Sequence, residues 1–356
     1  MFTVLNVFGY RQWLALAAAV VFSFLLVFVS RHHRLNRDTA IKASEPAVLL
    51  LHDAIDLDGL LGHLRQSGVS FHEKELLWAA QIMGWRRFQR GRYVVDGYSG
   101  YADFFSKLGR GLQDPLLVRI PPGQEKAMLK ERIAAQMQFE ADELAAAMKD
   151  TSFLNRHGIE AHRLYGRMLP DSYEVYWTSS PERLLERLLS EFERRVAIPY
   201  AGRMEELGRS VDEIATLASI IEWEARYDHE KPTISGLYWN RLNRRWRLQA
   251  DPTVNYAKGE RTRLVYADYR INHPYNTYRI HGLPPGPINN PSMASIQAAL
   301  FPEEHPYMYM VARPDGTHAF SRTYAEHRAR SREWTQWLRE QRRIQAEMER
   351  EEVAGS

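Results

Sequence analysis

The sequence has no cysteine, almost no imbalance of charge and no visible internal repeat. Without cysteine the chain cannot form disulfides, zinc–thiolate sites or a thiol nucleophile, and it fits any redox compartment. A net charge of +3 with 26% charged residues does not call for a nucleic-acid partner. The arginine-rich segments 241–247 and 328–343 are interleaved with polar and apolar residues, so we interpret them as solvated helix faces.

Histidines are present, but they show no metal-binding pattern. His273, His281, His305, His318 and His327 are scattered without the spacing that metal ligands need. We therefore expect no metal and no other cofactor. Only His318 and His327 are expected near a cleft.

One long apolar run is present. Residues 13–30 carry no charge, and as a helix they would be about 27 Å long, the minimum for crossing a bilayer. Basic residues follow at 31–34 in place of a small-residue cleavage site, which favours an uncleaved transmembrane anchor after a cytoplasmic tail at 1–12. The excess of arginine after the span would, by the positive-inside rule, place the large domain in the cytoplasm. That orientation stays open as an alternative.

The rest of the chain predicts an α+β protein with two folded parts. Residues 31–45 are interpreted as a tether, 46–115 as a small α+β module, 116–330 as a larger α+β domain and 331–356 as a charged helical tail. In the module we expect strands at 47–51 and 92–95 and helices at 57–67, 76–83 and 101–108. In the larger domain we expect a strand at 116–120, helices at 124–148, 151–157, 181–195, 210–226 and 292–301, and a hairpin of 307–312 with 318–320.

The helix at 210–226 places a carboxylate on its apolar face. Ser210 and Glu213 have the spacing of a capping box, which predicts the start of the helix. Ile214, Leu217 and Ile221 recur at steps of three and four, as on an inward face.

Glu224 is the next position on that stripe. Glu222 points to another side, where we expect a surface ion pair with Arg226. Burial would raise the pKa of Glu224 and make it a proton donor near neutral pH. The alternative, equally favoured by the periodicity, is a wet helix edge with a solvated carboxylate.

Residues 249–291 form a long segment rich in aromatic, amide and hydroxyl side chains. Long regular elements are not expected here, and so many aromatic residues argue against disorder. Such side chains suit sugars, which have apolar ring faces and a rim of hydroxyls. The alternative is a loop folded on itself, whose Tyr and Asn side chains satisfy buried backbone groups.

Ordered motifs in the C-terminal half resemble a known family, the membrane-anchored endolytic murein transglycosylases of the MltG/YceG-like type. The resemblance is specific over about 210–327. It rests on Leu-Ala-Ser-Ile-Ile-Glu-Trp-Glu at 217–224, Asn-Arg-Leu at 240–242, Leu-Gln-Ala-Asp-Pro-Thr-Val at 248–254, Pro-Tyr-Asn-Thr-Tyr at 274–278 and Gly-Leu-Pro-Pro-Gly-Pro-Ile at 282–288. Upstream, Gly166 and the segment 169–173 are similar to a family motif, and 46–115 resembles a LysM-like module in outline.

The resemblance implies an endolytic lytic transglycosylase with Glu224 as its acid/base. Such an enzyme cleaves the β-1,4 bond between N-acetylmuramic acid and N-acetylglucosamine in peptidoglycan and leaves 1,6-anhydro ends. It would be anchored in the inner membrane with a periplasmic catalytic domain, and it would meet penicillin-binding synthases. The substrate-binding residues expected in a loop-rich cleft are Ser219, Asn240, Gln249, Asp251, Thr253, Tyr275, Asn276 and Tyr278. A hydrolytic muramidase and a non-catalytic wall-binding scaffold are the alternatives.

Overall fold

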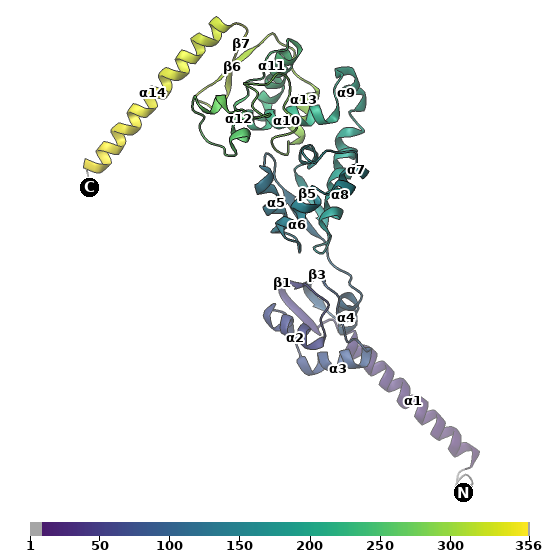
Figure 1. Ribbon diagram of the computed structural model, residues 1–356. Helices are drawn as coiled ribbons and strands as arrows, with labels where there is room; N and C mark the ends of the chain where they lie inside the picture. The colour runs from purple at the N-terminus through teal and green to yellow at the C-terminus, as the bar shows by residue number, and fades with distance from the viewer. Residues whose placement is uncertain (1–8, 355–356) are drawn as a thin grey trace. The chain divides into compact units, whose positions relative to one another are not determined.

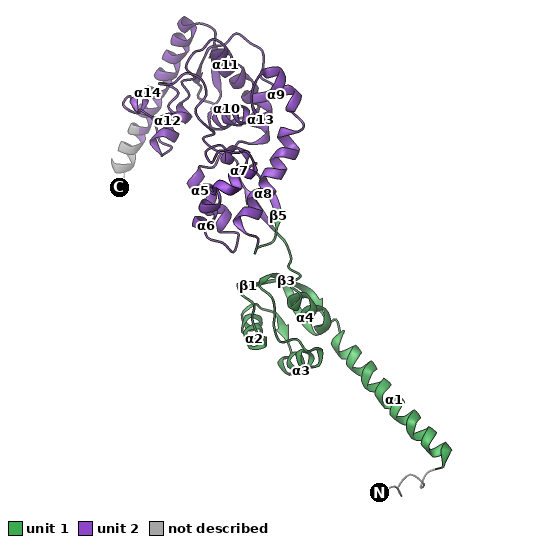
Figure 2. Cartoon of the chain, turned by 45° about the vertical axis from the view of Figure 1, so that its right-hand side comes forward, with its two compact units in different colours: residues 1–116, 174–178 green, residues 117–173, 179–356 purple. Residues whose placement is uncertain are grey.

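The computed structural model describes residues 9–354 of the chain, which divide into two compact units (Figure 2). Unit 1 comprises residues 1–116 and 174–178, and unit 2 comprises 117–173 and 179–356. Both units contain helices and strands, which confirms the α+β class. Residues 1–8 of the predicted cytoplasmic tail and the last two residues of the predicted C-terminal tail lie outside the described part.

The chain begins with a long apolar helix, α1 (Tyr10–Leu35). Its length and composition would allow it to cross a membrane, and none of its residues in the apolar window is buried. A signal sequence near an N-terminus meets the same criteria. The helix is longer than the predicted span 13–30 because the polar residues on both sides continue it.

Unit 1 contains a three-stranded antiparallel sheet in the order β2–β1–β3. The strands are β1 (Ile41–Leu51), β2 (Ser70–Phe71) and β3 (Gly91–Ser99), and the helices are α2 (Leu57–Gln66), α3 (Glu73–Met83) and α4 (Tyr101–Gly109). The sequence predicted this strand only from residue 47, whereas β1 begins at Ile41 and has a register shift between Ala43 and Ala47, the stretch that contains Pro46. Regular structure therefore covers most of the segment predicted as a tether.

The first part of unit 2 is mainly helical. Strands β4 (Leu116–Ile120) and β5 (Asp171–Val175) form a two-stranded sheet. The helices are α5 (Lys126–Ala134), α6 (Ala141–Ala147), α7 (Thr151–Arg156), the 3-10 turn η1 (Leu164–Arg167), α8 (Pro181–Phe192), the π turn η2 (Glu193–Ala197) and α9 (Ala201–Leu207). The prediction of one helix over 124–148 was wrong, because Glu140 and Glu143 form a capping box that starts α6 separately.

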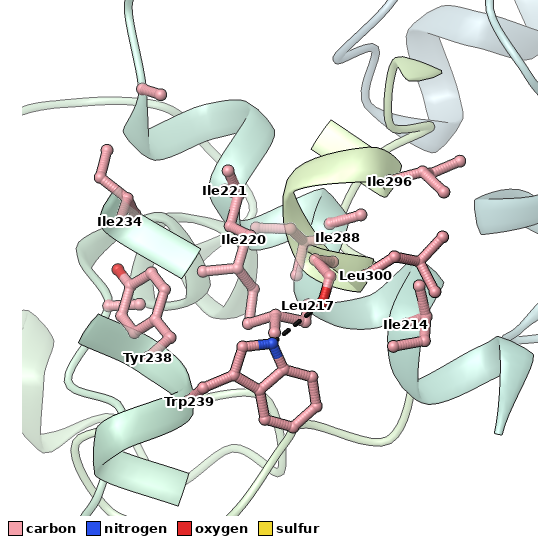
Figure 3. Packing of buried hydrophobic residues seen from close by; sticks show 14 of the residues in the cluster. Ile214, Leu217, Ile220, Ile221, Ile234, Tyr238, Trp239, Ile288, Ile296 and Leu300 are labelled. Carbon is pink, nitrogen blue, oxygen red and sulfur yellow. Dashed lines mark hydrogen bonds between the residues drawn. The ribbon is translucent and has the colours of Figure 1, made fainter. Parts of the chain in front are cut away.

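The main core of unit 2 is built around α10 (Val211–Glu224). Ile214, Leu217 and Ile221 are 0% exposed, which confirms the predicted inward stripe. They lie in one cluster with buried residues of α11 (Lys231–Asn243) and α13 (Met293–Leu300), including Ile234 and Ile296 (Figure 3). The capping box of Ser210 and Glu213 is also present, so the helix begins where predicted.

The segment after α11 contains more regular structure than predicted. Helix α12 (Asp251–Lys258) has Pro252 in its first turn and ends at Gly259, whose φ of 84° is left-handed. A 3-10 turn, η4 (Asp268–Arg270), follows α12, and another, η3 (Asp228–Glu230), precedes α11. The stretch from 271 to 292 has no helix or strand, as expected.

A hairpin and a long helix complete unit 2. Strands β6 (Tyr309–Ala312) and β7 (His318–Ser321) pair in antiparallel register, which confirms the predicted hairpin. Helix α14 (Tyr324–Ala354) begins directly after β7 and packs against both strands near its start (Figure 1). Side chains from the hairpin and from α14 can therefore reach a common site with the end of α10.

Candidate active site

A cavity of about 490 Å³ lies at the C-terminal end of α10. Its walls come from α10, α11, the start of α12, the hairpin and α14. Among the lining residues, those with polar or aromatic side chains are Glu224, Arg241, Gln249, Asp251, Tyr278, Tyr309, His318, Tyr324, His327 and Trp334. The cavity therefore brings together residues separated by more than a hundred positions in the sequence.

Glu224 is the last residue of α10, and the backbone becomes extended at Ala225. The residue as a whole is partly exposed, but its Oε2 atom is buried and has no hydrogen-bond partner among the described residues. Burial, reinforced by the negative charge of Asp251, raises the pKa of Glu224 to about 7. The Tyr238 hydroxyl and the Arg241 guanidinium act in the opposite direction. The carboxyl group is therefore available as a proton donor at neutral pH.

Arg241 supplies a fixed positive charge to the cavity. Its side chain is buried, and its Nε donates a hydrogen bond to the Met308 carbonyl at 2.9 Å. A second hydrogen bond runs to the Leu248 carbonyl. The sequence-based interpretation of 241–247 as a solvated face is wrong for Arg241, because these two carbonyls replace the water that a buried guanidinium loses.

Asp251, Tyr278 and Gln249 form the wall contributed by the start of α12 and the loop beside it. The Tyr278 hydroxyl donates to Asp251 Oδ1 at 2.6 Å, and the Tyr269 hydroxyl to Oδ2 at 3.4 Å. Gln249 has a φ of 49°, which is unusual for a residue other than glycine, and its N–H donates to the Thr277 carbonyl. The structure thus brings three of the predicted binding residues to the same cavity as Glu224.

Ser219 and Thr253 are fully buried and have partners inside the fold. The Ser219 hydroxyl donates to the Thr216 carbonyl and accepts the Ile288 N–H. The Thr253 hydroxyl bonds to Thr277 and to the Ala250 carbonyl. These contacts fix the loops beside the cavity, and neither side chain lines it.

Asn240, Tyr275 and Asn276 also lie outside the lining of the cavity. The Asn240 amide donates to two carbonyls of the segment before the hairpin, and the Asn276 amide to the carbonyls of Tyr269 and Ile271. Tyr275 packs against the ring of Tyr256 with centroids 4.5 Å apart. Direct binding of substrate by these three residues stays a prediction.

Glu222 does not form the predicted surface pair with Arg226. Its side chain is mostly buried, and its Oε2 accepts hydrogen bonds from the Ser292 and Ser295 hydroxyls, both at 2.5 Å, and from Lys231 Nζ at 3.2 Å. Burial alone would raise the pKa of Glu222, but these donors outweigh it and hold the pKa below its ordinary value. Sequence spacing could not reveal partners 9, 70 and 73 residues away.

The hairpin and α14 contribute cavity residues that the motifs did not single out. Tyr309 stacks on His327 with ring centroids 5.3 Å apart, and Trp334 lies two turns further along α14. His318 is held by Glu230, which accepts its N–H at 2.7 Å and contacts its Nδ1 at 3.2 Å. His318 and His327 both line the cavity, as expected. No sequence pattern marked Tyr309 or Trp334, since their contribution depends on how the hairpin and α14 pack.

With this geometry established, comparison with known proteins identifies the family. The YceG-like family matches residues 54–333. The chain belongs to this family. The match spans both folded units and includes every residue of the cavity except Trp334.

Similar proteins from bacteria are named for an enzymatic activity. The chain is 29% identical over 283 residues to an endolytic murein transglycosylase of Bacillus subtilis (strain 168), covering 74% of this chain and 78% of the relative. It is 24% identical over 282 residues to an endolytic murein transglycosylase of Streptococcus pneumoniae serotype 2, covering 70% of this chain and 51% of the relative. The chain thus spans about half the length of the pneumococcal protein.

The fold also matches a solved structure of the family. A 2.6 Å crystal structure of a yceG-like protein from Listeria monocytogenes aligns with a TM-score of 0.57 and 26% sequence identity. The alignment covers 81% of this chain and 99% of the Listeria chain.

Proposed function

We propose that this YceG-like protein is a membrane-anchored endolytic lytic transglycosylase that acts on peptidoglycan. It would cleave the β-1,4 bond between N-acetylmuramic acid and N-acetylglucosamine inside nascent glycan strands and so limit strand length. Membership of the family and the names of the Bacillus and Streptococcus relatives support this proposal.

The single observation that carries the proposal is the environment of Glu224. Its carboxyl group faces a cavity, has a buried oxygen without a partner, and has a pKa raised to about 7 by burial and by Asp251. A general acid is most effective when its pKa lies near the working pH. Glu224 is therefore the proposed acid/base, and Gln249, Asp251 and Tyr278 are the proposed substrate contacts beside it.

One carboxyl group can carry both proton transfers of the proposed reaction. Glu224 gives its proton to the glycosidic oxygen as the bond from that oxygen to C1 of N-acetylmuramic acid breaks. The 6-hydroxyl oxygen of the same sugar then bonds to C1, and its proton returns to the Glu224 carboxylate. No water is consumed, the product has a 1,6-anhydro ring, and Glu224 ends protonated as it began. Hydrolytic glycosidases use a pair of carboxyl groups instead.

Two other functions remain as alternatives with distinct products. In a muramidase, water would take the place of the 6-hydroxyl, and the new end would be one water heavier. In a non-catalytic scaffold, the cavity would bind glycan without cleaving it. The environment of Glu224 favours an enzyme, since carboxyl groups with a raised pKa that face a cavity occur mainly at catalytic sites.

The test is mass spectrometry of the products formed from uncrosslinked glycan strands. The full chain in detergent would be compared with Glu224→Gln and with Glu304→Gln, which changes an exposed carboxylate in the same unit. Anhydro-ended fragments from the parent and from Glu304→Gln, but none from Glu224→Gln, would support both reaction and residue. Hydrated ends would favour the muramidase, and intact strands with a folded parent would favour the scaffold.

The proposal places α1 in the inner membrane and both folded units outside the cytoplasm, where nascent strands and penicillin-binding synthases are found. The apolar composition of α1 supports anchoring. The arginines at 31, 34 and 37 outnumber the single Arg11 before the span, which favours the opposite orientation. A reporter protein fused after residue 356 tests the orientation. Reporter activity only in the cytoplasm would overturn the proposed topology.

A further inference from the structure

A second cavity adjoins the one that contains Glu224. It has a volume of about 560 Å³ and lies between the hairpin and α14. Val311, Ala312 and Trp334 line both cavities, so the two adjoin along these residues. A chain-like ligand that occupies the first cavity is therefore close enough to reach the second.

The second cavity has an excess of positive charge. Arg313, which follows β6, and Arg330 from α14 contribute guanidinium groups, and Glu333 is the one carboxylate among the residues that line this cavity. Among the described residues neither guanidinium lies within salt-bridge distance of a carboxylate, although Asp315 and Glu326 interact electrostatically with Arg313 and Arg330. Two guanidinium groups that line one cavity without a direct carboxylate partner are suited to a ligand with carboxylate groups.

Trp334 stands at the junction of the two cavities. The residue is partly exposed, and Trp337 stacks on its ring with centroids 4.9 Å apart. The stack restrains the Trp334 ring, so a sugar ring can pack on it at low entropic cost. The arrangement along the two adjoining cavities is therefore proton donor, aromatic platform and cationic pocket.

We propose that the cavity of Arg313 and Arg330 binds the carboxylate groups of the acidic stem peptide that the muramic acid residue carries, while Trp334 stacks on the adjoining sugar. This inference rests on the proposed function for the identity of the glycan. The sugar rings themselves are neutral, and in an intact strand the lactyl carboxyl group of muramic acid is tied up in the amide bond to the peptide. The carboxylates that guanidinium groups can bind there belong to the stem peptide and lie further from the sugar. The enzyme would then favour strands that still bear stem peptides over strands from which the peptides have been removed.

A binding experiment tests the inference without requiring cleavage. Full-length Glu224→Gln in detergent would be titrated by calorimetry with a muramyl disaccharide carrying a stem peptide and with the same disaccharide whose lactyl carboxyl group is capped as a simple amide. We expect the peptide to strengthen binding about tenfold, as two partly exposed charge pairs allow. Adding Arg313→Gln and Arg330→Gln should remove this preference and leave binding of the capped disaccharide unchanged. High salt should reduce the preference in the parent as well.

The matched control replaces Arg328 and Arg332 by Gln, since both are exposed on α14 and line neither cavity. It removes the same charge and should keep the tenfold preference. Trp334→Ala should weaken the binding of both ligands by the same factor, and Trp334→Phe should restore part of that affinity. Equal binding of the two ligands by the parent, or equal loss in the control and in the cavity variant, would overturn the inference.

A cleavage assay separates this inference from the proposed function. The parent would be given glycan strands with stem peptides and strands stripped of them. If the parent cleaves the strands with stem peptides faster, and the Arg313/Arg330 variant does not, the result supports both the inference and the proposed function. Equal cleavage of the two substrates overturns the inference and leaves the transglycosylase assignment in place. No cleavage of either, with the binding preference intact, overturns the proposed function alone.

Discussion

Glu222 and Glu224 lie two residues apart at the end of α10, and the pKa values of their carboxyl groups are shifted in opposite directions. Two residues correspond to about 200° around a helix, so the two side chains enter different surroundings. Glu222 meets the Lys231 amine and two serine hydroxyls, whereas Glu224 Oε2 meets no donor. The first carboxylate is thereby held in its charged form, and the second can be protonated near neutral pH.

The first prediction concerns the pH dependence of cleavage. Because the proposed acid must be protonated, and its pKa is about 7, the rate should fall as the pH rises through 7. We expect about a tenfold loss between pH 7 and pH 8.5, measured as kcat/KM on uncrosslinked strands. A rate that stays constant to pH 9 in a folded parent would contradict the assignment of Glu224.

The second prediction concerns stability. The pKa of Glu224 is raised from 4.5 to about 7 in the folded state, so its neutral form stabilises the fold below pH 4.5 and this contribution is lost as the pH rises through 7. Glu224→Gln should therefore unfold at higher denaturant concentration than the parent at pH 9, by up to about 3 kcal/mol. At pH 5 the two should be similar, and Glu304→Gln should match the parent at both pH values.

Glu222 should show the opposite dependence. Its pKa is lowered in the folded state, so its charge stabilises the fold above pH 4.5, and this contribution is lost as the pH falls through the folded pKa. Glu222→Gln leaves the buried Lys231 amine without its buried partner and should cost about 3 kcal/mol at pH 7. Urea titrations should show that the difference in free energy of unfolding between the parent and Glu222→Gln becomes smaller toward pH 3. A difference that stays the same at pH 3 would mean that packing, and not charge, explains the loss.

Local sequence patterns anticipated the elements whose signals are local. The capping box at Ser210, the stripe from Ile214 to Ile221 and the hairpin around residue 315 all depend on spacings of a few residues, and the structure contains each of them. The inward position of Glu224 followed from the same stripe. Patterns failed where a second signal competed, as at Glu140, where a new cap splits the predicted helix.

The parts of the cavity that come from distant segments could not be predicted in this way. Arg241 looked like one more residue of an arginine-rich surface, and only the carbonyls of Met308 and Leu248 make its burial possible. The family resemblance suggested Asn240 as a sugar contact; its amide donates to backbone carbonyls near residue 306, and its contact with substrate stays a prediction. Composition suggests which residues are suited to a sugar, but packing decides which of them are free to bind one.

The fourth prediction tests a close packing contact between α11 and the segment that follows α13. A Cβ atom on Gly236, in α11, would lie 2.2 Å from the backbone carbonyl oxygen of Glu303, which cannot move away as a side chain can. Gly236→Ala should therefore destabilise unit 2 by more than about 2 kcal/mol, measured by urea unfolding. Gly202→Ala, in the exposed helix α9, meets nothing within 4 Å and should be neutral or stabilising. Similar losses in both variants would contradict this explanation.

The last prediction tests whether Asp251 tunes Glu224. The negative charge of Asp251 contributes to the raised pKa of Glu224, so Asp251→Asn should shift the high-pH fall of the cleavage rate to lower pH. Tyr278→Phe is the matched control, because it removes the 2.6 Å hydrogen bond to Asp251 while keeping the Asp251 charge. It should lower the rate through lost positioning and leave the pH of the fall almost unchanged. If both variants shift the pH at which the cleavage rate falls by the same amount, the hydrogen bond causes the shift. If neither variant shifts this pH, Asp251 acts on the substrate and not on Glu224.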